Sequence, residues 1–135
     1  MLISINDLVK SSVKQSYVEK VIRTAYHQIK KTSKDYKLSV AFVDDQTIRH
    51  LNKKFRNKNK TTTILSFAYS KKSGEIILGW PEIKRKSLIS KIKLNDYLKI
   101  LLVHGLLHLF GYQHYNLKKA RLMEKIEDKI IKAIP

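Results

Sequence analysis

The sequence predicts one mixed α/β domain of the α+β type, in which a mixed four-stranded sheet is covered by helices. Short apolar runs alternate with stretches whose apolar residues recur at helical spacing, and a tight-turn sequence separates two of the runs. A length of 135 residues suits one hydrophobic core. No internal repeat, low-complexity tract or linker divides the chain, so we expect residues 1–135 to form a single domain.

The N-terminal part is expected to run strand, helix, strand, helix. The apolar run 2–5 predicts a short strand, and helical spacing of apolar residues over 16–31 predicts a helix with lysines on its other face. The run 37–43 predicts a buried strand, and Asp44 or Asp45 can cap the next helix. That helix carries one apolar stripe made of Ile48, Leu51 and Phe55.

A hairpin is expected in the middle of the chain, after a basic, polar loop at 56–62 that has nothing to bury. The run 64–69 predicts a strand, residues 71–74 its turn, and residues 75–78 the returning strand.

Three helices are expected in the remaining sequence. Pro81 suits the first position of a short helix, because its missing N–H is not needed there. A longer helix is predicted from Asn95, a suitable cap, to Phe110. The last helix is predicted over 117–134, with one apolar face formed by Met123, Ile126, Ile130 and Ile134.

Three histidines with ligand-like spacing are the main functional signal. His104 and His108 are four residues apart, so one helix face can direct both at one ion. Gly111 can adopt the left-handed conformation that ends a helix, and the reversed chain would deliver His114 as a third ligand. Three imidazoles leave one tetrahedral position open, as in catalytic zinc sites, although they also accept nickel, cobalt or copper. The alternative is a cluster of core histidines with a structural role.

The helix with these histidines resembles the metal-binding helix of metzincin proteases, in which a glutamate follows the first ligand and acts as general base. Here that position is Gly105. The sequence therefore predicts a metal-dependent hydrolase and disfavours a metalloprotease, because nothing at this place can accept the proton of the attacking water.

Composition points to an anionic partner. The chain has 28 Lys and Arg against 11 Asp and Glu, a net charge of +17, which favours RNA, DNA or an anionic membrane. The alternative is the Lys-rich composition of an AT-rich genome. No cysteine, signal peptide or apolar run of about 20 residues is present. We therefore expect a cytoplasmic protein with a nucleic-acid partner.

Two motifs resemble those of the YbeY endoribonucleases, also called rRNA maturation factors. The family form H-G-x-L-H-L-x-G-Y-D-H appears at 104–114 as HGLLHLFGYQH. The form L-N-x-x-Y-R-x-K-D-x-P-T-D-V-L-S-F appears at 51–67 as LNKKFRNKNKTTTILSF, and 74–76 matches the family's G-D-I. Three family acids are neutral here, since Gln113, Asn59 and Thr63 replace aspartates.

The resemblance implies a single-strand-specific endoribonuclease that acts in 3′-end maturation of 16S rRNA and in ribosome quality control. It implies one divalent metal, zinc, on His104, His108 and His114, and an important arginine at Arg56. The implied partners are single-stranded RNA, ribosomal RNA and the small ribosomal subunit, with no membrane and no DNA.

Phosphodiester cleavage builds negative charge on phosphate oxygens, and a guanidinium can bind two of them, so Arg56 is the candidate catalytic cation. Lys58 and Lys60 are expected to position the RNA backbone, and Ser66 to donate a hydrogen bond or to be structural. The nucleophile stays open between metal-activated water and the ribose hydroxyl, which leave a 5′ phosphate and a cyclic phosphate, respectively. Phe67, Tyr69 and Trp80 offer stacking faces or belong to the core.

Two other functional classes compete with this interpretation. One is a non-catalytic RNA-binding assembly factor whose histidines hold a structural metal. The other is a metalloprotease, which Gly105 and the positive charge disfavour.

Overall fold

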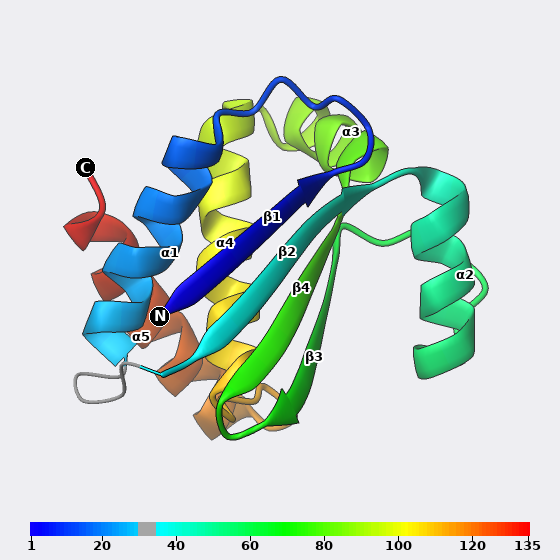
Figure 1. The fold of residues 1–135 in the computed structure, drawn as a ribbon. Coiled ribbons are helices and arrows are strands. Elements are labelled where there is room, and N and C mark those ends of the chain that lie inside the picture. Colours follow the sequence, from blue (N-terminus) through cyan, green and yellow to red (C-terminus); the bar gives the residue numbers. More distant parts are fainter. Residues whose placement is uncertain (30–34) are drawn as a thin grey trace.

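A computed structural model describes residues 1–29 and 35–135 of the chain (Figure 1). The elements in these residues are, in chain order, β1 (Leu2–Asp7), α1 (Gln15–Ile29), β2 (Lys37–Val43), α2 (Asp45–Arg56), β3 (Ile64–Ser70), β4 (Ser73–Gly79), α3 (Trp80–Ser90), α4 (Leu94–Leu109) and α5 (Leu117–Ala133).

The sheet is mixed and has the strand order β1-β2-β4-β3. β1, β2 and β4 run parallel to one another, and β3 returns antiparallel to β4 as an edge strand. The hairpin leaves β3 with one unpaired edge, and this edge borders the cleft described below. The predicted mixed four-stranded sheet and α/β class are confirmed.

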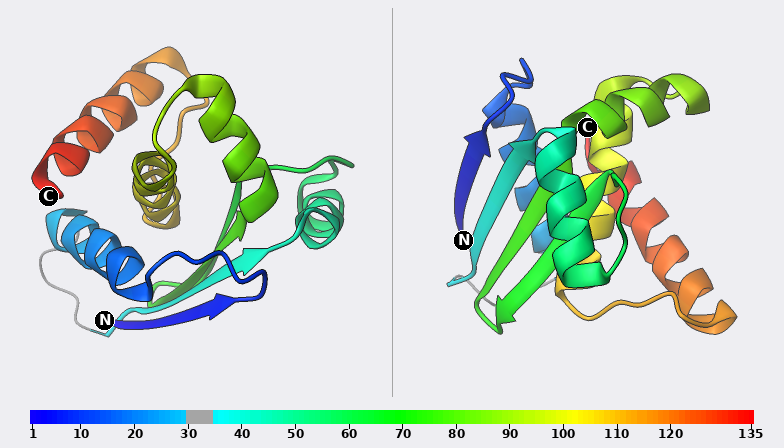
Figure 2. Two further views of the ribbon diagram at one scale, coloured as in Figure 1. Left: turned by 90° about the horizontal axis from the view of Figure 1, so that it is seen from above. Right: turned by 90° about the vertical axis from the view of Figure 1, so that its right-hand side faces the viewer.

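α4 forms the centre of the helical layer. Seen from above, it is enclosed by the sheet and by α1, α3 and α5 (Figure 2). Its buried residues Leu102 and Leu106 share one core with Val40 and Ile76 of the sheet. A helix that is apolar on most sides is stable only when neighbours cover it, so α4 is held firmly. The end of α4 therefore provides a rigid support for the histidines.

α2 packs on the opposite face of the sheet from α4 (Figure 2), and Asp45 at its start pairs with Arg85 of α3 at 2.7 Å. Ile48 on α2 is fully buried in a second, smaller cluster with Val43, Leu65 and Ile77. Because side chains alternate along a strand, Leu65 faces α2 whereas its neighbour Ser66 faces α4. Asp44 caps α2, since its carboxylate accepts the Thr47 N–H at 2.8 Å, as the sequence predicts.

Several boundaries differ from those predicted. α4 begins at Leu94, after Lys93, so the predicted cap Asn95 lies inside the helix; the half-buried Leu94 packs against the core and extends the first turn. The hairpin turn is 71–72, and Gly74 lies in β4, where it pairs with Leu38 and Ala68; a Cβ at this position would clash with the Tyr36 hydroxyl. The predicted helix end at 30–31 lies outside the described residues.

Burial decides the role of Trp80 and shows where Phe55 lies. Trp80 is 4% exposed and packs edge-on against Phe42 in the core, so it offers no stacking face. Phe55, predicted on the apolar stripe of α2, is 54% exposed and contacts Phe67, which itself packs against the second cluster. Among the described residues, no helix has both the length and the apolar character required to cross a bilayer.

Candidate metal centre

The C-terminal end of α4 and the loop after it bring the three histidines together. His104 and His108 lie one turn apart on the helix. The chain then reverses at Gly111, whose φ of +90° is a conformation that residues with a Cβ rarely adopt. The Tyr112 N–H donates to the Leu107 carbonyl at 3.1 Å, which closes the helix end and leads the loop back toward His114.

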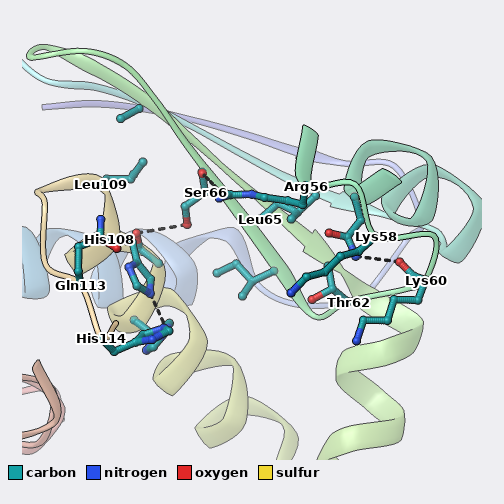
Figure 3. Close-up of a pocket in the computed structure, with 15 residues that line it drawn as sticks. Arg56, Lys58, Lys60, Thr62, Leu65, Ser66, His108, Leu109, Gln113 and His114 are labelled. Atoms are coloured by element: carbon teal, nitrogen blue, oxygen red, sulfur yellow. Dashed lines mark hydrogen bonds between the residues drawn. The ribbon is translucent and has the colours of Figure 1, made fainter. Parts of the chain in front are cut away.

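The three imidazole rings converge, and Figure 3 shows two of them, His108 and His114, side by side. The Nε2 atoms of His104 and His108 are 2.9 Å apart. His114 completes the group, and one ring nitrogen from each of the three residues lies within 4.8 Å of the others. His104 and His108 are partly buried, whereas His114 is exposed, so the group lies at the mouth of a cavity.

Hydrogen bonds fix the tautomers of the two helical histidines. His108 Nδ1 donates to the Tyr112 carbonyl at 2.9 Å, because a carbonyl can only accept. His104 Nδ1 donates to the Glu127 carboxylate. Each Nε2 therefore presents a lone pair, and two lone pairs cannot hydrogen-bond to each other. A cation between them satisfies both, and two nitrogens of a tetrahedral zinc site lie about 3.3 Å apart. The donor set thus fits a divalent metal.

Burial is the main cause that lowers the pKa of His108, and the neighbouring His104 and His114 lower it further. A lowered pKa favours the neutral imidazole, which is the form that binds metals.

Glu127 is a functional residue that the sequence interpretation missed. It lies on α5, 23 residues after His104, and only the packing of α5 against α4 brings the two together. A carboxylate behind a ligating histidine fixes the ring and makes it a better donor. The sequence contains one signal: Glu127 falls four residues after Met123 and three before Ile130, on the face that those residues bury.

Basic side chains form the opposite wall of the same cleft, which has a volume of about 610 Å³. Arg56 closes α2, and the left-handed residue Asn57 (φ 58°) then turns the chain so that Lys58 and Lys60 also line the cleft. Figure 3 shows these cations across from His108 and His114, with Ser66 between the two groups. The cleft therefore combines a metal-binding wall with an anion-binding wall.

The basic loop is held by a buried amide. Asn52 is 3% exposed, and its Nδ2 donates to the Lys60 carbonyl at 2.9 Å. The Lys58 N–H donates to the Asn52 carbonyl at 3.3 Å. One side chain and its backbone thus set the position of the loop that carries the two lysines.

Ser66 and Gly105 fasten the edge strand β3 to α4. The Ser66 hydroxyl donates to the Gly105 carbonyl at 3.3 Å. A Cβ on Gly105 would lie 2.7 Å from Cδ1 of Ile64 and 3.0 Å from the Ser66 hydroxyl. Close packing therefore explains why a glutamate, the metzincin base, is not found at this position.

The three neutral replacements lie in different surroundings. Gln113 lines the cleft near His114. Asn59 accepts a hydrogen bond from Arg49 Nε at 2.9 Å, in a separate groove on the outer side of α2. The Thr63 carbonyl accepts the Gly79 N–H at 2.8 Å, where it supports the start of the hairpin.

Comparisons with known proteins identify the family of the chain. A family model described as "Endoribonuclease YbeY" matches residues 4–135. The curated relative of that name from Neorickettsia sennetsu is 36% identical over 107 residues, which cover 75% of each chain. The Agrobacterium fabrum relative is 38% identical over 103 residues, covering 70% of this chain and 61% of its own. The relative from Gluconobacter oxydans is 36% identical over 98 residues, and the match spans 58% of its length.

The solution structure of TM1509 from Thermotoga maritima has a TM-score of 0.69 to this chain, at 24% identity, and the match covers 98% of this chain and 89% of that one. This likeness supports the fold. The match over residues 4–135 and the identities above show that the chain belongs to the endoribonuclease YbeY family.

Proposed function

We propose that the protein is a metal-dependent endoribonuclease that cleaves single-stranded RNA. The observation that carries the proposal is the cleft in which three convergent imidazoles face Arg56, Lys58 and Lys60. A phosphodiester needs both features, since its cleavage builds negative charge on oxygens that a metal and a cation together can stabilise. The curated relatives named endoribonucleases agree with an RNA substrate.

His104, His108 and His114 are the proposed ligands of one divalent ion. We propose zinc, with nickel, cobalt and copper as alternatives, because three imidazoles suit all four ions. When bound, such an ion supplies Lewis acidity at the phosphate. Glu127 and the Tyr112 carbonyl hold two of the rings so that their Nε2 atoms face the ion.

Arg56 is the proposed catalytic cation. Its Nη2 donates to the Ser66 carbonyl at 3.0 Å, which holds the guanidinium at the edge of β3 and leaves further N–H donors for phosphate oxygens. Lys58 and Lys60 would bind neighbouring phosphates of the RNA backbone. The Ser66 hydroxyl, already bonded to Gly105, would have the smaller role of a substrate contact or a support of the strand.

The substrate we propose is ribosomal RNA, in 3′-end maturation of 16S rRNA and in ribosome quality control. The small ribosomal subunit would then be the partner, and the cytoplasm the site of action. The net charge of +17 supports a polyanionic partner. We expect no role for DNA or for a membrane.

Untagged protein tests the proposal through its metal content and its action on RNA. We expect about one equivalent of metal, almost none in His108→Ala, and cleavage of an unstructured oligoribonucleotide that a chelator stops and metal restores. Arg56→Lys should keep the metal but cleave far more slowly, because lysine cannot bind two phosphate oxygens in a plane. His50→Ala is the matched control, since His50 is exposed and lies outside the cleft.

Two outcomes would replace this function with another. If the protein bound ribosomal RNA but cut none with any of the four metals, and His114→Ala bound equally well, it would be a non-catalytic assembly factor. Chelator-sensitive cleavage of an unfolded protein would instead indicate a metalloprotease.

A further inference from the structure

An aromatic ring is exposed beside the proposed phosphate site. Phe55 immediately precedes Arg56 and is 54% exposed. Its ring lies edge-on to Phe67 of β3, with centroids 5.2 Å apart and an interplanar angle of 66°. A T-shaped contact fixes the orientation of a ring while it leaves ring surface open. Phe55 is therefore a pre-oriented aromatic surface with more than half of its area exposed.

Cations surround this aromatic pair. Lys54 Nζ lies 5.3 Å from the Phe55 centroid, and Arg56 Cζ lies 5.8 Å from the Phe67 centroid. Aromatic rings that alternate with basic side chains are typical of surfaces that bind single-stranded nucleic acid, because the rings stack with bases and the cations bind phosphates.

The aromatic pair is continuous with the cleft. Arg56 lines the cleft and also contacts Phe67, and its guanidinium lies at the edge of β3 through its bond to the Ser66 carbonyl. Ser66 and Phe67 are neighbours on β3, so their side chains lie on opposite faces of the sheet. A strand whose phosphate is bound at Arg56 would thus meet the Phe55 ring on passing around this edge.

From these contacts we propose that Phe55 is a stacking platform for one unpaired nucleobase of the RNA, next to the phosphate bound by Arg56. The inference rests on the proposed function and extends it, because it identifies a residue that selects unpaired RNA. A base in a duplex has both faces stacked on its neighbours, so it cannot lie on the Phe55 ring.

Tyr69 provides a matched comparison on the same strand. It is 64% exposed, but its hydroxyl donates to the Glu75 carboxylate at 2.5 Å. A carboxylate repels the phosphates on either side of a stacked base. The position of the charges therefore favours Phe55 over Tyr69 as the platform.

The test uses an unstructured oligoribonucleotide with one 2-aminopurine, placed at successive positions, because the fluorescence of this base is quenched by stacking. The full-length protein should quench it strongly at a particular position. Phe55→Leu keeps the apolar volume but lacks the ring, so we expect roughly tenfold weaker binding and loss of that quenching. Phe55→Trp should retain both, and Tyr69→Leu should behave as the unchanged protein.

Phe55→Trp gives a second, independent signal. The chain has one natural tryptophan, Trp80, which is 4% exposed. RNA should therefore quench the emission of the new Trp at position 55 and leave the unsubstituted protein's emission unchanged. This readout remains informative if Phe55→Leu proves unstable.

The proposal is overturned if Phe55→Leu binds and quenches as before, if it loses as much affinity for a duplex, or if Tyr69→Leu loses as much as Phe55→Leu. Failure of the proposed function gives a different result. If quenching depends on Phe55 but the protein cleaves no RNA, the proposed nuclease function is wrong and the stacking role of Phe55 stands. If Phe55→Leu binds and cleaves RNA like the unchanged protein, the stacking role is wrong and the nuclease function stands.

Discussion

The orientation of His104 depends on Glu127, a residue that lies 23 positions further along the chain. The carboxylate accepts a hydrogen bond from the Nδ1–H of the imidazole, so the opposite nitrogen carries the lone pair that faces His108. In the sequence motif, the acid expected beside the third histidine is missing, since Gln113 stands there. The structure locates a supporting carboxylate at the first histidine instead.

Removal of this carboxylate should weaken metal binding. We expect the dissociation constant of the metal to rise by about 10- to 100-fold in Glu127→Ala, because the ring loses its fixed tautomer and orientation. Glu127→Gln should show a smaller effect, since its amide oxygen can still accept a hydrogen bond from the Nδ1–H. Competition with a chromogenic chelator measures both values.

The matched control is Glu124→Ala, an exposed position on the same helix. Equal metal affinity in Glu127→Ala and Glu124→Ala would show that Glu127 has no positioning role.

Gly105 has a packing role in addition to its bearing on the chemistry. From the sequence, this glycine is notable only as the absence of a protease base. The structure shows a packing requirement, because a Cβ at this position would press on Ile64 and Ser66 where β3 meets α4. The close contact of β3 with α4 at Gly105 therefore also keeps a glutamate base out of the cleft.

At the scale of elements, the basic loop after α2 depends on the buried side chain of Asn52. Its amide replaces water for the Lys60 carbonyl, so its loss leaves a carbonyl without that partner.

We expect Asn52→Ala to lower the free energy of unfolding by about 1–3 kcal/mol, the cost of a lost buried hydrogen bond, and to weaken RNA binding as the loop loosens. Urea titration gives the first quantity and fluorescence anisotropy the second. Asn59→Ala is the control, because Asn59 is exposed and bonds Arg49 outside the cleft. If both variants unfold at the same urea concentration, the amide does not hold the loop.

Elements that can be recognised from their own residues were predicted accurately, whereas boundaries set by tertiary packing were not. Strand β2 matches its predicted range 37–43, because a buried apolar run between polar residues identifies a strand without reference to the rest of the chain. The start of α4 and the turn of the hairpin were wrong by one or two residues. Leu94 at the start of α4 packs against the core, and Gly74 after the hairpin turn packs beneath Tyr36. The local sequence does not reveal either contact.

At the scale of the whole molecule, the charge of +17 and the cleft act together. A large positive charge attracts any polyanion, and the cleft selects which phosphate reaches the histidines. Affinity for RNA should therefore contain a strong non-specific part.

The salt dependence of RNA binding can distinguish phosphate contacts made by Lys58 and Lys60 from attraction by the overall positive charge. We expect the logarithm of the RNA affinity to fall linearly with the logarithm of the salt concentration. Lys58→Gln and Lys60→Gln should each reduce the slope by about 0.7, the value for one phosphate contact on a single strand. Lys20→Gln on α1 is the control, because Lys20 is exposed and lies outside the cleft. An equal change of slope in all three variants would mean that RNA is not localised in the cleft.

The amino-acid sequence alone determined the mixed α/β class, the order of the elements and the grouping of three histidines. These features depend on periodicity and on spacings within about three helical turns, which the chain sets locally. Only the tertiary structure placed Glu127 behind His104, brought Arg56 across from the histidines, and left Phe55 exposed beside Phe67. Those relations join distant segments, and they exist only because α4 packs against α5 and the edge strand while α2 packs on the other face of the sheet.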